Sequence, residues 1–345
     1  MELRIGKHTI SNIQPMYVIA EIGVNHNGSL ELAKKMVASA RDCGADAVKF
    51  QMFRSEELVS DQAALVEYQK ASTTDSTQLE MLRRLELDES AFLELKSFCD
   101  TLGVTFLATP FDIKSAYTLN RMGIEAFKIG SGDITNLQLL AAVGSFHKPV
   151  VLSTGMTTLG EIEIALAVLK QAPKVALLHC TSAYPAPYGS INLRVIETLK
   201  PAFGGIIGYS DHSVGMEVPI AAAALGYKIL EKHFTLDHTM SGPDHQASME
   251  PEPFRRMIEA IRHVELALGI TQKRVTEVEE QTRELVRRGV YAGKDLPAGH
   301  VIQESDLQLL RPLGEIDAAQ YKQLLGKKTT HSFKKGEPLS WQGLA

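Results

Sequence analysis

Short β-rich segments alternate with stretches of helical period from the start of the chain to about residue 269. Several β-rich segments are continuous apolar runs, which is typical of parallel strands buried on both faces. The clearest helical stretch spaces its apolar residues i, i+3, i+4, i+7 from Phe254 to Leu268, and Gly269 stands where a C-cap glycine belongs. The pattern predicts eight strands, at Val18–Gly23, Ala47–Phe53, Val104–Pro110, Ala126–Gly130, Pro149–Thr154, Val175–Cys180, Gly205–Ser210 and Lys228–Phe234.

Eight strand–helix units in about 250 residues match a (β/α)₈ TIM barrel in count and size. A doubly wound open sheet is the alternative, but no G-x-G-x-x-G motif follows the first strand. We therefore predict an α/β barrel over residues 1–270. A long excursion through Ser60–Leu87 separates the second and third strands. It is either a lid or binding loop on the catalytic face or a surface helix, and both interpretations stay open.

The character of the sequence changes after Gly269. Residues 271–288 are highly charged and suit a helical linker, whereas residues 289–345 are short-stranded and punctuated by Gly and Pro. Two similar phrases, Leu296–Ile302 and Phe333–Leu339, predict paired turn–strand elements of a small β domain. So short a segment makes a marginal core, and we expect it to dock against something larger.

Composition narrows the class of protein. Thirty-six basic and 41 acidic residues leave a net charge of −5, which argues against a nucleic-acid-binding or membrane-binding protein. No 18-residue apolar run occurs, and the first 16 residues lack an apolar signal core. The three cysteines form no Cys-x-x-Cys pair, so a disulfide framework is not expected. We expect a cytoplasmic protein.

Polar side chains crowd the C-terminal ends of the predicted strands, which form the catalytic face of a barrel. Lys49 and Gln51 point the same way because strand residues two apart share a face. A single lysine or serine at a strand end is often solvated or caps the next helix. Their recurrence across eight strands predicts a site for a small polyanion, made by Lys49, Thr109, Lys128, Ser131, Ser153 and Ser210.

Histidines and carboxylates complete the predicted mouth. His212 and His233 end neighbouring strands and suit a divalent ion, although a histidine pair is more often hydrogen-bonded structure. Glu21 and Asp133 can transfer protons, or they can act as counter-charges for the lysines. Asp244 follows the last strand and can bind a sugar hydroxyl or form a turn.

Eight short phrases run in order through the chain: Glu21–Ser29, Val48–Gln51, Thr109–Asp112, Lys128–Asp133, Leu152–Met156, Ser210–His212, Glu231–Thr235 and Gly242–His245. As a set they resemble the N-acetylneuraminate (sialic acid) synthase family. The tail at 289–345 is similar to the antifreeze-like C-terminal domain of that family. The resemblance covers essentially the whole chain.

The resemblance implies a site shared by two chains of a homodimer, with the small domain of one covering the barrel of the other. It implies Mn²⁺ or Mg²⁺ on His212 and His233. It also implies an N-acetylated hexosamine bound by Gln51, Tyr184 and Asp244, with Arg311 reaching the N-acetyl group from the partner. Phosphoenolpyruvate would take the polyanion site, bound by Lys49, Thr109, Lys128, Ser131, Ser153 and Ser210.

Some positions depart from the family pattern. Asp133 replaces the usual glutamate, Ser182 and Ala183 replace a more polar pair, and Leu313 replaces part of a glycine-rich turn after Arg311. One family asparagine has no counterpart that we can place in the long loop around residues 72–74.

The expected reaction condenses phosphoenolpyruvate with N-acetylmannosamine and water, giving a sialic acid and phosphate by C–O cleavage. Glu21 is expected to manage the protons, with Asp133 assisting. Precursors of N,N'-diacetyllegionaminic or pseudaminic acid are the alternative acceptors. A Schiff-base aldolase using Lys49, Lys128 or Lys232 is an enzymatic rival. A non-catalytic sugar- or ice-binding protein is the rival from another class.

Overall fold

The computed structural model of the protein describes residues 2–60, 62–65 and 75–345. The chain divides into two compact units, Met1–Gly269 and Ile270–Ala345. Across the described ranges, no helix has both the length and the apolar character needed to cross a bilayer.

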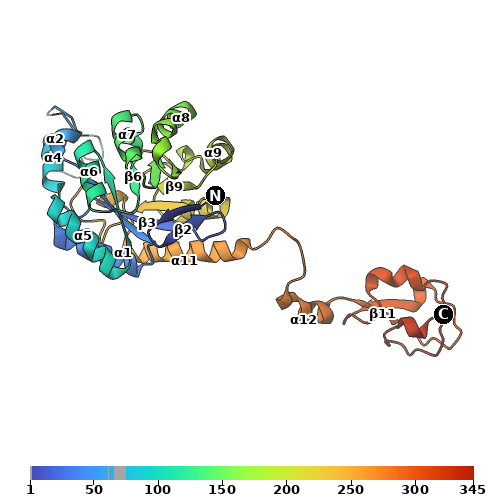
Figure 1. Ribbon diagram of the computed structural model, residues 1–345. Coiled ribbons are helices and arrows are strands. Elements are labelled where there is room, and N and C mark those ends of the chain that lie inside the picture. The colour runs from blue at the N-terminus through green and yellow to red at the C-terminus, as the bar shows by residue number, and fades with distance from the viewer. Residues whose placement is uncertain (1, 61, 66–74) are drawn as a thin grey trace. The chain divides into compact units, whose positions relative to one another are not determined.

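Eight parallel strands of the larger unit close into a barrel in the order β10-β3-β4-β5-β6-β7-β8-β9. Figure 1 shows the helices on the outside of this unit. The predicted barrel fold is confirmed, and each strand overlaps its predicted range. The last strand closes on the first through the pairing of β10 with β3. The strands are β3 (Tyr17–Gly23), β4 (Ala47–Met52), β5 (Thr105–Pro110), β6 (Phe127–Ile129), β7 (Val150–Ser153), β8 (Val175–Cys180), β9 (Ile207–Asp211) and β10 (Ile229–His233).

Helices surround the strands, and several begin at a side chain that caps the first turn. Ser29, Asp88 and Asp112 each accept a hydrogen bond from a backbone N–H three residues on, and Thr158 forms a capping box with Glu161. The helices are α1 (Leu30–Asp42), α5 (Glu89–Leu102), α6 (Ile113–Arg121), α7 (Leu137–Ser145), α8 (Leu159–Val168), α9 (Ile196–Phe203), α10 (Glu217–Leu225) and α11 (Pro251–Leu268), with 3₁₀ turns η1 (Ser131–Asp133), η2 (Leu169–Gln171), η3 (Tyr188–Ser190), η4 (Leu193–Val195) and η5 (His245–Ala247).

The barrel has one apolar layer inside the strands and another between strands and helices. The outer layer includes Val48 and Phe50 of β4, and Phe50 contacts the rings of Phe92 and Phe106. The inner layer is extended by a hairpin of β1 (Glu2–Ile5) and β2 (His8–Ser11), which no predicted element anticipated. Leu3, Ile5 and Ile10 of this hairpin pack with the interior residues and close the N-terminal end of the barrel.

The excursion after β4 contains α2 (Ser55–Leu58) and α4 (Gln78–Leu85). Met81 and Leu85 of α4 pack against Val24 and Phe53, which lie beside the C-terminal ends of β3 and β4. This packing holds α4 on the face where the polar strand ends gather. Residues 72–74, where a family asparagine could not be placed, lie outside the described residues.

The smaller unit begins with α12 (Glu277–Val286) and continues into a compact β-rich fold. The two similar phrases pair as predicted, because Leu296 and Phe333 exchange two backbone hydrogen bonds of 2.8 Å. Both side chains are buried in the core of the unit. Its other elements are β11 (Gly289–Ala292) and β12 (Leu307–Leu310), which pair antiparallel, and the 3₁₀ turns η6 (Glu304–Asp306), η7 (Ala318–Leu324) and η8 (Trp341–Gly343).

Candidate active site

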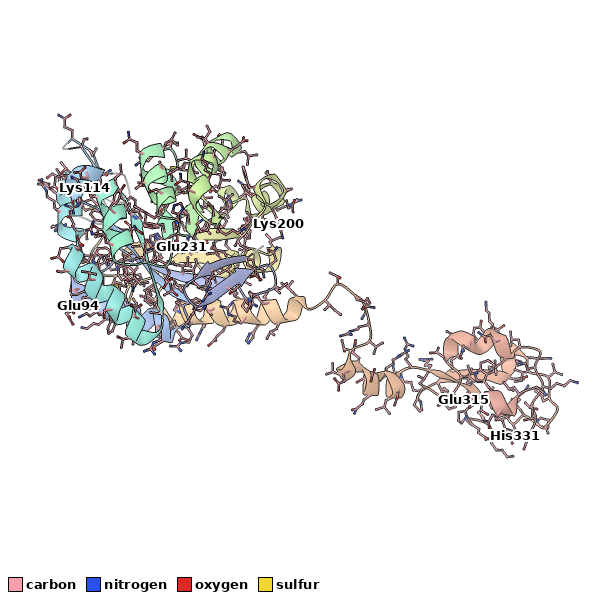
Figure 2. The ribbon with its side chains drawn as sticks, viewed as in Figure 1. Glu94, Lys114, Lys200, Glu231, Glu315 and His331 are labelled. Carbon is pink, nitrogen blue, oxygen red and sulfur yellow. The ribbon has the colours of Figure 1, made fainter. Side chains whose placement is uncertain are left out.

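A cavity of about 590 Å³ opens at the C-terminal ends of the barrel strands. Figure 2 shows Glu231 of its lining within the barrel unit, whereas Glu94, Lys114 and Lys200 lie on the outside. The predicted site residues that line this cavity are Glu21, Lys49, Gln51, Thr109, Lys128, Ser131, Ser153, Tyr184, Ser210, His212 and His233.

Strand alternation explains why these side chains meet. On β10, Glu231 and His233 line the cavity, while Lys232 between them faces away from it. On β9 and the residue after it, Ser210 and His212 line the cavity in the same way. Alternating residues of neighbouring parallel strands therefore stack around one mouth.

Lys49 lies at the centre of a buried charge cluster. Its Nζ is 2.6 Å from Oε2 of Glu21 and 3.8 Å from Oε2 of Glu231. It also donates to the Thr109 hydroxyl at 3.1 Å. Gln51 donates to the other oxygen of Glu21 at 3.2 Å. The predicted ion pair of Lys49 with Glu21 is therefore present, and it lies inside the predicted anion site.

Lys128 provides the second cation. Its Nζ donates to the Ser153 hydroxyl at 2.7 Å and lies 3.5 Å from Oε1 of Glu231. The Ser210 hydroxyl donates to the same Glu231 oxygen at 2.8 Å. Glu231 thus bridges the two lysines, and hydroxyl groups surround the cluster. An incoming dianion would find two ammonium groups and several hydroxyls within one cavity.

The two glutamates of this cluster differ in acidity. Burial alone would raise the pKa of Glu231, but the charges of Lys128 and Lys49 outweigh it and lower that pKa to about 2. Burial raises the pKa of Glu21, and the nearby Glu231 charge adds to the rise, although Lys49 opposes both. Neighbouring carboxyl groups with divergent pKa values are typical of acid–base sites. Glu231 is therefore a permanent counter-charge, whereas Glu21 can exchange a proton.

Asp244 lies at the edge of this cluster, with Oδ2 3.9 Å from Nδ1 of His233. Burial and the Glu21 charge raise its pKa to about 7, against the opposing effect of Lys49. A carboxyl group with that pKa changes charge near neutral pH, so it can accept or donate a hydrogen bond to a ligand hydroxyl.

A tight turn after β7 closes one wall of the cavity. The backbone N–H of Gly155 donates to the Ser131 hydroxyl at 2.8 Å, and Ser131 also contacts the Cys180 thiol at 3.1 Å. A Cβ on Gly155 would lie 2.4 Å from Oγ of Ser182 and 2.7 Å from Sγ of Cys180. Only glycine fits there, because any side chain would displace the wall.

His212 and His233 lie side by side, with ring centroids 5.6 Å apart and the Tyr184 ring 4.1 Å from His212. Burial lowers the pKa of both imidazoles, so the neutral, ligating form is favoured. Nδ1 of His212 is 2.8 Å from the Thr181 carbonyl oxygen. Since a carbonyl only accepts, that nitrogen carries the proton and Nε2 keeps its lone pair.

This donor set fits a divalent metal ion. A backbone carbonyl that orients a ligating histidine is the usual partner of such a ligand. Nδ1 of His233 is buried and has no hydrogen-bond partner among the described residues, which is costly unless something binds nearby. The cluster of three possible ligands in the described ranges lies elsewhere, at Asp237, His238 and Glu250, so an ion at His212 and His233 would take its further ligands from water or substrate.

Asp244 and three other predicted or considered residues are absent from the cavity lining. Asp133 is in η1, half-buried, where Asn136 donates to it at 3.2 Å. Lys232 faces outward and pairs with Asp211, so it is wrongly placed for a nucleophile in the cavity. Arg311 belongs to the smaller unit, next to Pro312, and is described only within that unit.

Glu231 received no role in the predicted site, although it bridges both lysines. Its spacing two residues before His233 was the available signal, since the alternation of a strand places both on one face. The excursion after β4 also contributes Gln78 to the cavity lining. A helix position on a long loop carries no comparable periodic signal.

Comparison with known proteins identifies two family matches. The NeuB family model matches residues 36–273, and the SAF domain model matches residues 287–345. An N,N'-diacetyllegionaminic acid synthase of Campylobacter jejuni subsp. jejuni serotype O:2 is 45% identical, over 93% of this chain and 97% of that protein. A protein of the same name from Legionella pneumophila subsp. pneumophila is 40% identical, over 94% of each chain.

A solved structure shows the same architecture. It is an N-acetylneuraminic acid (sialic acid) synthetase from Leptospira borgpetersenii serovar Hardjo-bovis in complex with citrate. It superposes with a TM-score of 0.74 at 35% identity, over 82% of this chain and 95% of that one.

The raised pKa of Asp244 predicts a pH-dependent contribution to stability. Unfolding returns this carboxyl to its ordinary pKa of 3.8, so the folded state binds more protons between that value and about 7. The contribution is full below pH 3.8 and is lost as the pH rises through about 7. Asp244→Asn stays neutral and avoids this loss. Its stability relative to the unchanged protein should rise by about 4 kcal/mol across this range, at ~1.4 kcal/mol per pKa unit.

Guanidinium unfolding of the metal-free barrel at several pH values measures that difference. Asp100→Asn, which changes an exposed aspartate of α5 far from the cavity, serves as the control for the removal of a carboxylate. A pH-independent difference for Asp244→Asn would contradict the raised pKa.

Proposed function

The chain belongs to the NeuB family of sialic-acid-type synthases. From that membership we propose that it condenses phosphoenolpyruvate with a diacetamido-trideoxyhexose to give N,N'-diacetyllegionaminic acid. The family makes it an enzyme that joins phosphoenolpyruvate to a sugar. The observation that carries the proposed site is the placement of Lys49, Lys128 and the His212–His233 pair in one cavity.

The lysine cluster suits phosphoenolpyruvate. Both ammonium groups are almost fully buried, at 3% exposure for Lys49 and 2% for Lys128. Burial of a cation without an anion is unfavourable, and in the free protein Glu21 and Glu231 supply the opposite charge. The phosphate and carboxylate of the substrate would add negative charge beside the same lysines and the hydroxyls of Ser131, Ser153 and Ser210.

The metal ion that fits His212 and His233 would supply Lewis-acid polarisation of the aldehyde oxygen of the open-chain sugar. The protein side chains do the rest. His212 is held in one tautomer by the Thr181 carbonyl, and the Tyr184 ring packs against it. Gln51 and Asp244 stand beside Glu21, where they can orient the hydroxyl groups of the sugar.

The bond changes require several proton transfers. C3 of phosphoenolpyruvate attacks the aldehyde carbon, and the aldehyde oxygen takes up a proton. Water adds to C2 and gives up one proton. The C2–O bond to phosphate then breaks with its electron pair on the phosphate, and the C2 hydroxyl passes its remaining proton to the phosphate as the C=O bond forms. Glu21 is the group proposed to move these protons, because its raised pKa lets it hold a proton beside a charged Lys49.

The diacetamido sugar is favoured over N-acetylmannosamine by the relatives. The two with identities of 40% and 45% are named for N,N'-diacetyllegionaminic acid. A pseudaminic acid synthase of Campylobacter jejuni is less similar, at 32% identity. The cavity wall at Ser182 and Ala183 offers one hydroxyl and one methyl group, a surface suited to acetamido and methyl substituents.

A Schiff-base mechanism is disfavoured at two of the three candidate lysines. Lys232 lies outside the cavity lining. Burial lowers the pKa of Lys49, but Glu21 and Glu231 raise it by more than burial lowers it, so its amine stays protonated. Lys128 has a lowered pKa because of its burial, but its ammonium already donates to Ser153.

Removing the proposed proton carrier should separate binding from turnover. Glu21→Gln keeps the shape of the side chain, so phosphoenolpyruvate should still bind, while kcat should fall about 10²–10⁴-fold. Calorimetry with phosphoenolpyruvate and a phosphate-release assay measure the two quantities. Glu31→Gln, an exposed residue of α1, is the matched control and should retain full activity. Normal turnover of Glu21→Gln would remove Glu21 from the mechanism.

A substrate panel tests the acceptor sugar. Phosphate release from phosphoenolpyruvate should have a kcat/KM at least about tenfold higher with the diacetamido-trideoxyhexose than with N-acetylmannosamine, because one buried group of the size of a methylene is worth about 1–3 kcal/mol. A preference for N-acetylmannosamine would reverse the proposed acceptor. The absence of phosphate release with every acetamido sugar would reject the condensation itself.

The proposal includes a homodimer in which Arg311 serves the cavity of the partner chain, as the family resemblance implies. Each site would then combine one chain's His233 with the other chain's Arg311.

Mixing two inactive variants tests this arrangement. Arg311→Ala and His233→Gln should each be inactive alone. After the chains exchange, each mixed dimer holds one intact site, so an equimolar mixture should recover about a quarter of the wild-type activity. A site built from a single chain would recover none.

A further inference from the structure

A buried ion pair lies directly behind the two histidines of the cavity. Nζ of Lys232 is 2.5 Å from Oδ2 of Asp211, and both side chains are almost fully buried. The two residues are direct partners in the register of β9 and β10. Each immediately precedes a histidine, since Asp211 is followed by His212 and Lys232 by His233.

The hydrogen bonds of this pair are nearly saturated. Oδ1 of Asp211 accepts from the Ser213 backbone N–H at 2.9 Å, the Ser213 hydroxyl at 2.7 Å and the Tyr209 hydroxyl at 3.0 Å. Lys232 donates a second bond to the Ser213 carbonyl at 2.8 Å. The network therefore ties β10 to β9 and to the turn that follows β9, on both sides of His212.

The outward side of β3, which pairs with β10, is apolar. Its residues Val18, Ala20 and Ile22 pack in the layer beneath the helices. A buried ion pair in such a layer is weak evidence for stability, because apolar residues of similar volume often serve equally well or better. The ion pair is better explained by the orientation of the residues next to it in the two strands.

We infer that Asp211 and Lys232 are positioning residues that hold His212 and His233 in the geometry needed for a divalent ion. Strand alternation points the side chains of the pair away from the cavity and the two imidazoles into it. Fixing Asp211 and Lys232 therefore also fixes the backbone of the histidine that follows each of them. Groups that orient metal ligands typically contribute about 10–100-fold to metal affinity. This inference rests on the metal site of the proposed function.

Calorimetric titration of the full-length protein with Mn²⁺ tests the inference. The informative variant combines Asp211→Asn with Lys232→Met, because it leaves the net charge of the pair unchanged. No charge is left unpaired, and the amide oxygen can still accept from Ser213 and Tyr209. We expect Mn²⁺ to bind about 10–100-fold more weakly than to the wild type, as found when groups that orient metal ligands are lost.

A second ion pair provides the matched control. Asp46 and Arg262 lie 3.5 Å apart before β4, at the opposite end of the barrel. Asp46→Asn combined with Arg262→Met also preserves net charge, and it should leave Mn²⁺ affinity unchanged. Thermal unfolding without Mn²⁺ compares the stability of both double variants, so a loss of affinity can be separated from a loss of stability.

The outcomes distinguish the two levels of the proposal. Wild-type Mn²⁺ affinity in the Asp211 and Lys232 double variant, or an equal loss in the control, would overturn the positioning role and leave the metal site standing. Failure of the wild-type protein to bind Mn²⁺ would overturn the metal site and this inference together. If the double variant does not fold, Tyr209→Phe removes one hydroxyl donor to Asp211 while both charges stay paired, and it should still weaken Mn²⁺ binding; an unchanged affinity would overturn the inference.

Discussion

Lys49, buried between Glu21 and Glu231, is the interaction on which the rest of the site depends. Its ammonium group can remain charged in the barrel only because two carboxylates accompany it. The same arrangement separates the pKa values of the two glutamates. Glu231 stays charged, whereas Glu21 lies near both that negative charge and Lys49. In the function proposed above, anion binding and proton transfer therefore depend on the same cluster.

Alternation along the strands explains how much of the molecule could be predicted. The period of two along each strand, together with the barrel fold, was enough to place Lys49, Lys128, His212 and His233 at one mouth. The same rule also places Glu231 there, but in the sequence a glutamate two residues before a histidine is equally compatible with an exposed position. Only the distances to both lysines show that it bridges them.

Other features depend on tertiary contacts that no local pattern carries. The hairpin of β1 and β2 is short, and its role in closing the barrel follows from Leu3 and Ile10 packing with residues far along the chain. Asp133 follows a predicted strand in the sequence, but it lies in η1, where it accepts a hydrogen bond from Asn136 and does not line the cavity. Asp244 lies on an irregular segment whose approach to His233 is set by the fold.

The two faces of β9 and β10 carry different kinds of side chain. The inner side presents Ser210, His212, Glu231 and His233 to the cavity, while the outer side is tied by Asp211 and Lys232. The two strands thus carry the cavity residues on one face and the ion pair on the other.

A crystal structure of the protein with phosphoenolpyruvate and Mn²⁺ tests the central claim most directly. We predict the phosphate and carboxylate of the substrate beside Lys49 and Lys128, and an anomalous manganese signal within bonding distance of His212 and His233, about 2.0–2.3 Å. Phosphoenolpyruvate bound away from the two lysines, or manganese at Asp237, His238 and Glu250 instead, would contradict the account.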